Sequence, residues 1–129
     1  MDTRDKIIDC KSAQAVAAQL RQHGVPLKIV TGYFDVLVAA HVRRLRQIAD
    51  GRSKLLALVL DHPAPLLATR ARAELVAGLE VVDYVVPAGE EAAESLLRGL
   101  AGSLIVREES ADRLRVEHLR QHVQRCHQQ

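Results

Sequence analysis

The sequence predicts a single α/β domain, a Rossmann-like doubly wound parallel sheet with helices on both faces. Three observations predict it. Short apolar runs alternate with amphipathic stretches, as in consecutive strand–helix units. The 129 residues suffice for one compact core. No repeat, low-complexity tract or linker divides them. Residues 1–129 should therefore form one domain, with an N-terminal helix over 12–23, a core over 27–106 and a C-terminal helix over 110–127.

The elements follow from periodicity and from the residues that end them. Strands are expected at 27–30, 55–60, 81–86 and 103–106, and helices between them at 38–49, 69–79 and 90–100. Ser12 is expected to cap the first helix and Gly24 to end it. Gly51 should stop the helix over 38–49, and Pro87 should stop the third strand.

Composition excludes several classes of protein. The formal net charge is +2, and the chain has no Trp, one Phe and two Tyr, so the basic patches and stacking platforms of nucleic-acid-binding proteins are missing. The longest apolar run, 55–60, is too short to cross a bilayer. The opening residues lack a signal-peptide pattern. We therefore expect a cytoplasmic protein with neither nucleic acid nor membrane as a partner.

The most informative stretch is KIVTGYFDVLVAAHVRRL, residues 28–45. In a doubly wound sheet, the carboxyl end of the first strand and the start of the next helix form a phosphate site. Gly32 would let the backbone approach a triphosphate closely, and His41 would add a hydrogen-bond donor.

This stretch resembles the G-x-F-D-x-x-H-x-G-H signature of the cytidylyltransferase-like nucleotidyltransferases. The matching residues are Gly32, Phe34, Asp35 and His41. Residues 72–86, RAELVAGLEVVDYVV, are similar to a second segment of that family. Within it, the chain looks most like the heptose-phosphate adenylyltransferase domain and glycerol-3-phosphate cytidylyltransferase.

The resemblance implies transfer of a nucleotidyl group from ATP or CTP, with Mg²⁺, to a sugar or polyol phosphate. It implies a catalytic role for His41 and no protein-bound metal site. The nucleotide-binding residues that it implies are Gly32, Tyr33, Phe34, Asp35, His41 and Arg72. Related enzymes are often dimers, so the nucleotide, a small phosphorylated substrate and a second copy of the chain are the expected partners.

The chain departs from the family at positions that its chemistry needs. Val38 replaces the first histidine of the signature and Ala40 replaces its second glycine. A valine donates no hydrogen bond, and losing one preorganised donor costs roughly 10²–10³-fold in rate. All four lysines (Lys6, Lys11, Lys28 and Lys54) precede the end of the second strand, so the later lysines of the family are absent. The family's late S-T-T segment has no counterpart either. Arginines (Arg70, Arg72 or Arg107) are candidate replacements for these cations.

Two functions therefore stay open. One is a nucleotidyltransferase with weak transfer. The other is a pseudoenzyme that acts as a nucleotide-binding or protein-interaction module. Whether the chain is an enzyme is left undecided.

Several residues have a structural interpretation beside the functional one. Asp35 is expected to bond backbone amides of its own turn, and Phe34 to pack in the core. Arg72 either holds a phosphate or is a solvated helix arginine. Two more groups are expected to be exposed polar helix faces, although the first has a zinc-like spacing: His118, His122 and Cys126; and Arg43, Arg44 and Arg46.

Overall fold

A four-stranded parallel sheet forms the centre of the protein, seen here in a computed structural model that describes residues 2–35, 37, 39–63, 65–100 and 102–127. The strands are β1 (Leu27–Gly32), β2 (Lys54–Leu60), β3 (Tyr84–Ala88) and β4 (Leu104–Arg107). Their order across the sheet is β3-β2-β1-β4. Both central strands are almost continuously buried, as expected when helices cover both faces.

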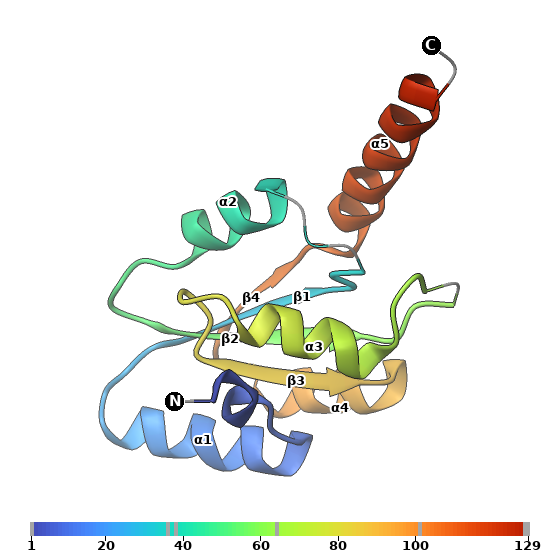
Figure 1. Ribbon diagram of the computed structural model, residues 1–129. Helices are drawn as coiled ribbons and strands as arrows, with labels where there is room; N and C mark the ends of the chain where they lie inside the picture. The colour runs from blue at the N-terminus through green and yellow to red at the C-terminus, as the bar shows by residue number, and fades with distance from the viewer. Residues whose placement is uncertain (1, 36, 38, 64, 101, 128–129) are drawn as a thin grey trace.

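Two helices pack on each face of the sheet (Figure 1). The bounds of these helices are α1 (Cys10–Gln22), α2 (Ala39–Ile48), α3 (Thr69–Ala77) and α4 (Glu90–Gly99). α1 and α4 cover one face, where Leu96 is buried against Leu56 and Leu58. α2 and α3 cover the other, where Leu45 and Val76 are buried. Each such aliphatic side chain contributes about 1.5–3 kcal/mol on burial. The doubly wound fold predicted from the sequence is confirmed.

Several predicted boundaries are wrong. β3 begins at Tyr84 and not at residue 81. α1 begins at Cys10, because the carboxylate of Asp9 accepts a hydrogen bond from the Ser12 amide at 2.7 Å and caps the helix. The predicted cap, Ser12, therefore lies inside the helix. Pro87 does not stop β3 but pairs with Val59 within it. A proline is tolerated there because β3 has a full strand partner, β2, on one side only.

The N-terminal segment covers part of the open side of β3. It contains a short 3₁₀ helix, η1 (Thr3–Lys6). Ile7 then forms a parallel bridge with Val85, and the Ile8 amide donates to the Val85 carbonyl oxygen at 2.8 Å.

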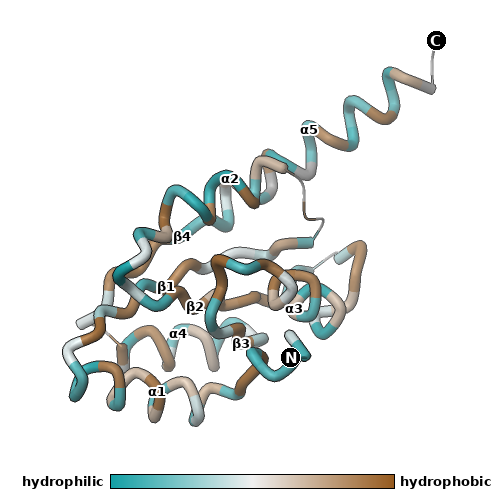
Figure 2. The backbone as a smooth tube through the Cα atoms, turned by 60° about the vertical axis from the view of Figure 1, so that its left-hand side comes forward, coloured by the Kyte–Doolittle hydropathy of each residue, from teal (hydrophilic) through white to brown (hydrophobic). Residues whose placement is uncertain are grey.

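The last helix, α5 (Glu109–His127), starts at the end of β4 and projects away from the sheet (Figures 1 and 2). Figure 2 shows the brown, hydrophobic strands inside the body and a mixed pattern along α5. Leu114 and Val123 are exposed on it. Among the described residues, no helix is both long and apolar enough to cross a membrane.

Candidate functional site

The candidate site lies where the chain reverses its direction of travel across the sheet. From β1 the chain builds β2 and β3 on one side, and then returns to place β4 on the other side of β1. In open α/β sheets, ligands bind outside the carboxyl ends of the strands at such a switch point. Thr31 pairs with Arg107 there, so the residues that follow β1 and β4 lie beside one another.

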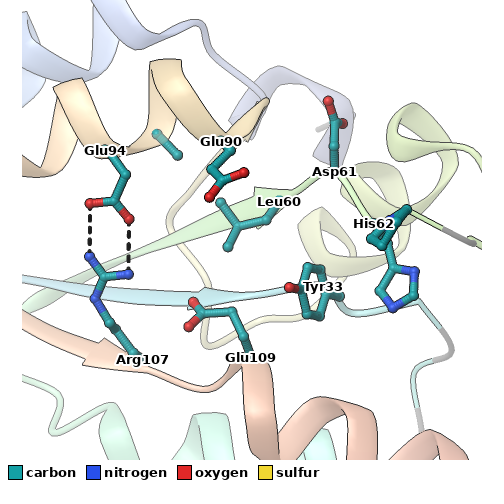
Figure 3. A pocket seen from close by; sticks show the side chains of 10 residues that line it. Tyr33, Leu60, Asp61, His62, Glu90, Glu94, Arg107 and Glu109 are labelled. Carbon is teal, nitrogen blue, oxygen red and sulfur yellow. Dashed lines mark hydrogen bonds and ion pairs between the residues drawn. The ribbon is translucent and has the colours of Figure 1, made fainter.

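A pocket of about 550 Å³ opens at this edge (Figure 3). It is lined by Tyr33, Leu60, Asp61, His62, Pro63, Glu90, Ala93, Glu94, Arg107 and Glu109. Four of these side chains are carboxylates and one is a guanidinium, so the lining is acidic overall. The rings of Tyr33 and His62 meet edge to face, with centroids 4.7 Å apart.

Arg107, the guanidinium of the pocket, is paired with Glu94. Its two terminal nitrogens each donate to a Glu94 oxygen at 3.1 Å, joining the end of β4 to α4 (Figure 3). These hydrogen bonds hold the pKa of the Glu94 carboxyl below its usual range and raise that of Arg107. Arg107, one of the three arginines named as candidate replacements for the family lysines, therefore lies in the pocket, but a carboxylate engages it.

Two other acidic side chains of the pocket accept hydrogen bonds from nearby hydroxyl groups. Thr31 donates to Glu109, and Thr69 donates to Asp61 at 2.7 Å. Among the described residues, no group of three or more His, Cys, Asp or Glu side chains is placed to hold a metal ion. In α5, Cys126 Sγ lies 3.7 Å from His122 Nε2.

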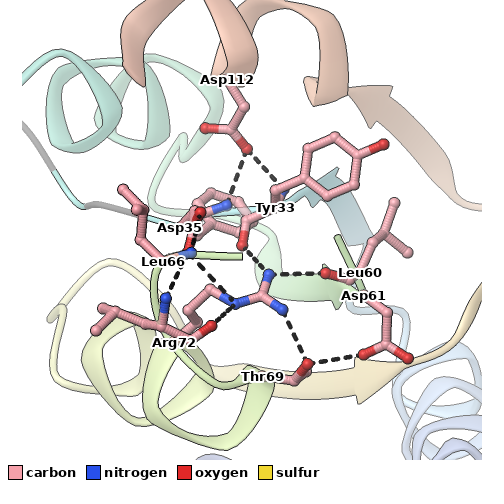
Figure 4. A network of polar contacts seen from close by, with 10 residues as sticks. Tyr33, Asp35, Leu60, Asp61, Leu66, Thr69, Arg72 and Asp112 are labelled. Atoms are coloured by element: carbon pink, nitrogen blue, oxygen red, sulfur yellow. Dashed lines mark hydrogen bonds and ion pairs between the residues drawn. The ribbon is translucent and has the colours of Figure 1, made fainter. Parts of the chain in front are cut away.

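Next to the pocket, the backbone after β1 surrounds a carboxylate from α5 (Figure 4). Asp112 Oδ2 accepts hydrogen bonds from the Tyr33 amide at 2.7 Å and from the Phe34 amide at 3.1 Å. Its other oxygen forms an ion pair with His41 Nε2, and Arg115 Nη1 lies 4.0 Å from that oxygen. His41 and Asp112 are each 1% exposed.

The backbone has an unusual shape at this point. Phe34 adopts a φ of 48°, in the left-handed region that an aromatic residue rarely enters. Such a conformation costs about 1–3 kcal/mol and persists where the surroundings hold it. The buried ring of Phe34 belongs to the core on the α2 and α3 face. A side chain at Gly32 would collide with Asp112 Oδ2 and this ring.

Asp35 binds amides as predicted from the sequence, but in a different segment. Its carboxylate accepts hydrogen bonds from the amides of Leu66 and Leu67, at 2.8–3.0 Å, in the loop that follows β2. The expectation that it also serves its own turn stays a prediction, because residues 36 and 38 of that turn lie outside the described residues. Asp35 joins the loops after the two central strands.

Arg72 is fully buried, so the interpretation of this residue as a solvated helix arginine is wrong. The guanidinium donates to the carbonyl oxygens of Leu67, Tyr33 and Leu60 at 3.1, 2.6 and 2.8 Å. It also donates to Thr69 Oγ1 at 2.8 Å (Figure 4). The main chain around the site thus occupies most of its donors, and a nucleotide-binding role for Arg72 stays a prediction.

Of the other arginines singled out in the sequence, Arg43 and Arg46 are exposed on α2. Arg44 is paired with Glu108, and Arg70 with Glu74 at 3.3 Å. Val38, the substituted signature position, lies outside the described residues.

The structure brings together five of the six residues that the resemblance named. Gly32, Tyr33, Phe34 and His41 surround Asp112, and Arg72 bonds to the Tyr33 carbonyl oxygen. The sixth residue, Asp35, lies beside Arg72, with its Oδ1 3.9 Å from Arg72 Nε. Sequence reasoning missed Asp112, Glu109 and Glu94. The clustered acids at 108, 109 and 112, directly after a strand, were the available signal.

Comparison with known proteins finds relatives of the chain. No protein-family model matches the chain. Curated relatives include the bifunctional protein HldE of Wolinella succinogenes, 30% identical over 82% of this chain and 24% of that protein. The HldE of Chromohalobacter salexigens is 33% identical over 70% of this chain and 21% of that protein. The HldE of Vibrio parahaemolyticus is 30% identical over 82% and 24%.

The chain thus spans about a quarter of the length of these relatives. The parallel sheet, the signature stretch at the carboxyl edge of β1 and the HldE relatives agree with one another. The comparisons therefore support the resemblance of this chain to the cytidylyltransferase-like nucleotidyltransferases.

Proposed function

We propose that the protein is a nucleotidyltransferase-like domain that accepts ATP or CTP at the pocket beside β1 but has weak or lost nucleotidyl transfer. Its relationship to HldE supports the nucleotide as ligand. The acidic lining of the pocket supports the weak or lost transfer, and it is the observation that carries this part of the proposal.

The electrostatic reason is the sign of the charges around the phosphates. Two unit charges 4 Å apart interact by about 4 kcal/mol near a protein surface. A triphosphate in this pocket would face four carboxylates, while Arg107, the guanidinium in its lining, is engaged by Glu94. Nucleotidyl transfer depends on stabilising the charge that develops on the phosphates, and this lining opposes it.

The remaining signature histidine supports the same conclusion. His41 Nε2 contacts the Asp112 carboxylate, and both side chains are 1% exposed. In this arrangement Nε2 of the imidazole is occupied by a carboxylate of the protein itself. A catalytic role for His41 therefore requires that Asp112 first leave.

Mg²⁺ would enter with the nucleotide. Magnesium is usually held by one or two carboxylates together with substrate phosphates. The described residues include single carboxylates such as Asp61 and Glu90 in the pocket, which fits that mode of binding, but no dedicated cluster.

The test is a calorimetric titration of the protein with ATP and with CTP, each with Mg²⁺, followed by a pyrophosphate-release assay with sugar and polyol phosphates. We expect millimolar to high-micromolar binding of one nucleotide and little or no pyrophosphate. Rapid pyrophosphate release would contradict the weak or lost transfer. Absence of binding heat at millimolar nucleotide would exclude ATP and CTP as ligands.

A protein-interaction role is the second candidate, and the projecting helix α5 favours it. Leu114 is 61% exposed and Val123 is 45% exposed on this helix. A second copy of the chain is the expected partner. Sedimentation velocity of the wild type and of a Leu114→Ser, Val123→Ser variant tests this, because a dimer held by α5 should dissociate in the variant. An unchanged dimer would exclude this contact, and a monomeric wild type would exclude the homodimer.

A further inference from the structure

We infer that the recess formed by Gly32, the Tyr33 and Phe34 amides and His41 is an anion-binding site that the chain fills with its own Asp112 carboxylate. The first turn of α5 is then a plug that a phosphate must displace. The inference deepens the proposed function, because the phosphate of a nucleotide is the competing anion.

The donors of this recess belong to segments other than the helix that supplies the carboxylate. An acidic residue in the first turn of a helix ordinarily bonds amides of its own helix. Asp112 instead accepts hydrogen bonds from two consecutive amides after β1 and contacts an imidazole from α2. Consecutive amides that converge on one oxygen form the kind of concave site that binds phosphates.

The backbone is shaped for close approach of an anion. Phe34, whose amide is the second of the two donors, has a positive φ, and both N–H groups point toward the same oxygen. At Gly32, the space that a Cβ would need contains Asp112 Oδ2 and the Phe34 ring. The glycine therefore permits an oxygen to lie against the backbone, and at present this oxygen belongs to the protein.

The carboxylate excludes solvent from this recess as a bound ligand would. Asp112 is 1% exposed, and its Oδ1 lies against His41 Nε2 and 4.0 Å from Arg115 Nη1. A second anion cannot enter while Asp112 is there, because the same amides and the same imidazole would have to serve both.

The attachment of α5 allows the plug to leave without unfolding the sheet. The start of the helix is tied down by the Glu108 amide, which donates to the Thr31 carbonyl oxygen at 2.8 Å, and by the contact between Thr31 and Glu109. From Glu117 onward, most described side chains of α5 are exposed. Displacing Asp112 therefore breaks contacts of the first turn and leaves the cores on both faces intact.

The test compares the wild type with Asp112→Asn and Asp112→Ala, and uses Glu117→Gln as the matched control. The control removes the same charge from the same helix, at an exposed residue whose described hydrogen bond comes from Gln121. Inorganic tripolyphosphate is the probe, because it reports on the anion site without a base or sugar. Circular dichroism and thermal unfolding establish that each variant is folded. If Asp112→Ala does not fold, the test uses Asp112→Asn, which keeps the shape of the side chain.

Two measurements are made on each protein. Calorimetry should show tripolyphosphate binding tightened about tenfold or more in the Asp112 variants, because neutralising a buried negative charge removes its repulsion of the anion. The control should stay within about twofold of the wild type, because exposed charges are screened. Residue-resolved hydrogen exchange should show faster exchange of the Tyr33 and Phe34 amides in Asp112→Ala, and slower exchange again when tripolyphosphate is added.

Unchanged tripolyphosphate affinity in folded Asp112 variants would overturn the inference, and so would amides at 33 and 34 that stay equally protected. ATP and CTP titrations of the same proteins separate this inference from the proposed function. Variants that bind tripolyphosphate but neither ATP nor CTP would support the anion site and contradict nucleotide binding by the protein. If the wild type binds ATP as tightly as Asp112→Asn does, nucleotide binding is supported. The inference that Asp112 competes with phosphate is then contradicted.

Discussion

Asp35 and Arg72 lie side by side in the interior, with Oδ1 of the carboxylate 3.9 Å from Nε of the guanidinium, and both bond the main chain around the site. Asp35 holds the amides of Leu66 and Leu67, while Arg72 holds the carbonyl oxygens of Tyr33 and Leu60 (Figure 4). The pair therefore fixes the loops after β1 and β2, which form two walls of the site.

Removing this buried cation should be strongly destabilising. Arg72→Met keeps an apolar stem but leaves three carbonyl oxygens without this donor and the buried Asp35 carboxylate without its cation. We expect a loss of about 3–5 kcal/mol in the free energy of unfolding, measured by urea denaturation.

Arg70→Met is the matched control, because Arg70 lies on the same helix in an exposed pair with Glu74. It should cost less than about 1 kcal/mol. An Arg72→Met variant that is no less stable than this control would show that the buried hydrogen bonds contribute little.

Adding one methyl group at Gly32 should disturb the recess directly. Gly32→Ala places a carbon against Asp112 Oδ2 and 3.0 Å from the Phe34 ring, so we expect a loss of about 1–3 kcal/mol in stability. Combining it with Asp112→Ala should recover part of that loss, and the double-mutant cycle measures the recovered part.

The control for this change is Gly102→Ala. A Cβ there meets its nearest atom, from Arg21, at 4.0 Å, so the change should stay within about 0.5 kcal/mol. Strictly additive effects of Gly32→Ala and Asp112→Ala would contradict the close contact between residues 32 and 112.

The sequence predicts the fold well because the fold depends on repeated, local patterns. Each strand is a short apolar run and each helix has an apolar face, and the glycines that end helices, Gly24 and Gly51, have positive φ values of 70° and 76°. The boundaries at Ser12 and Pro87 were wrong because Asp9 is the alternative cap and because β3 lies at an edge.

The site is harder to predict because its contacts join residues that are distant in the chain. The sequence places Gly32, Phe34 and His41 together through one local motif. Nothing local indicates that a carboxylate 78 residues after Phe34 bonds its amide. The same holds for Arg72, which reads as an ordinary polar residue on a helix and is fully buried only in the folded chain.

Stability at acidic pH should depend on Asp50, which closes the turn before β2. Its pKa lies well below its ordinary value of 3.8, because its carboxylate accepts hydrogen bonds from the amides of Ser53 and Arg52 and pairs with Lys28 at 3.0 Å. A depressed folded-state pKa stabilises the protein above the unfolded value, and this contribution is lost as the pH falls through the folded value.

Urea unfolding of the wild type and of Asp50→Asn should therefore differ most above pH 3.8 and converge as the pH drops below it. Asp83→Asn is a less suitable control because Asp83 bonds the Leu55 amide, so the exposed Glu91→Gln is preferred. A difference between wild type and Asp50→Asn that stays constant down to pH 2 would contradict this role of the charge.

Releasing Arg107 from Glu94 should make the pocket more favourable to phosphates. Glu94→Gln removes one of four carboxylates and weakens the two hydrogen bonds that now engage the guanidinium. Tripolyphosphate affinity, measured by calorimetry, should rise by about three- to tenfold, since hydrogen bonds between charged groups contribute about 1.5–3 kcal/mol and Arg107 would make only part of them to the new ligand.

Glu91→Gln, on the same helix but outside the pocket, should change the affinity by less than about twofold. If both variants raise the affinity equally, net charge accounts for the effect and the pairing of Arg107 with Glu94 does not. If Glu94→Gln and Asp112→Asn are each effective and their effects multiply in the double variant, the pocket and the recess beside β1 act as independent anion subsites.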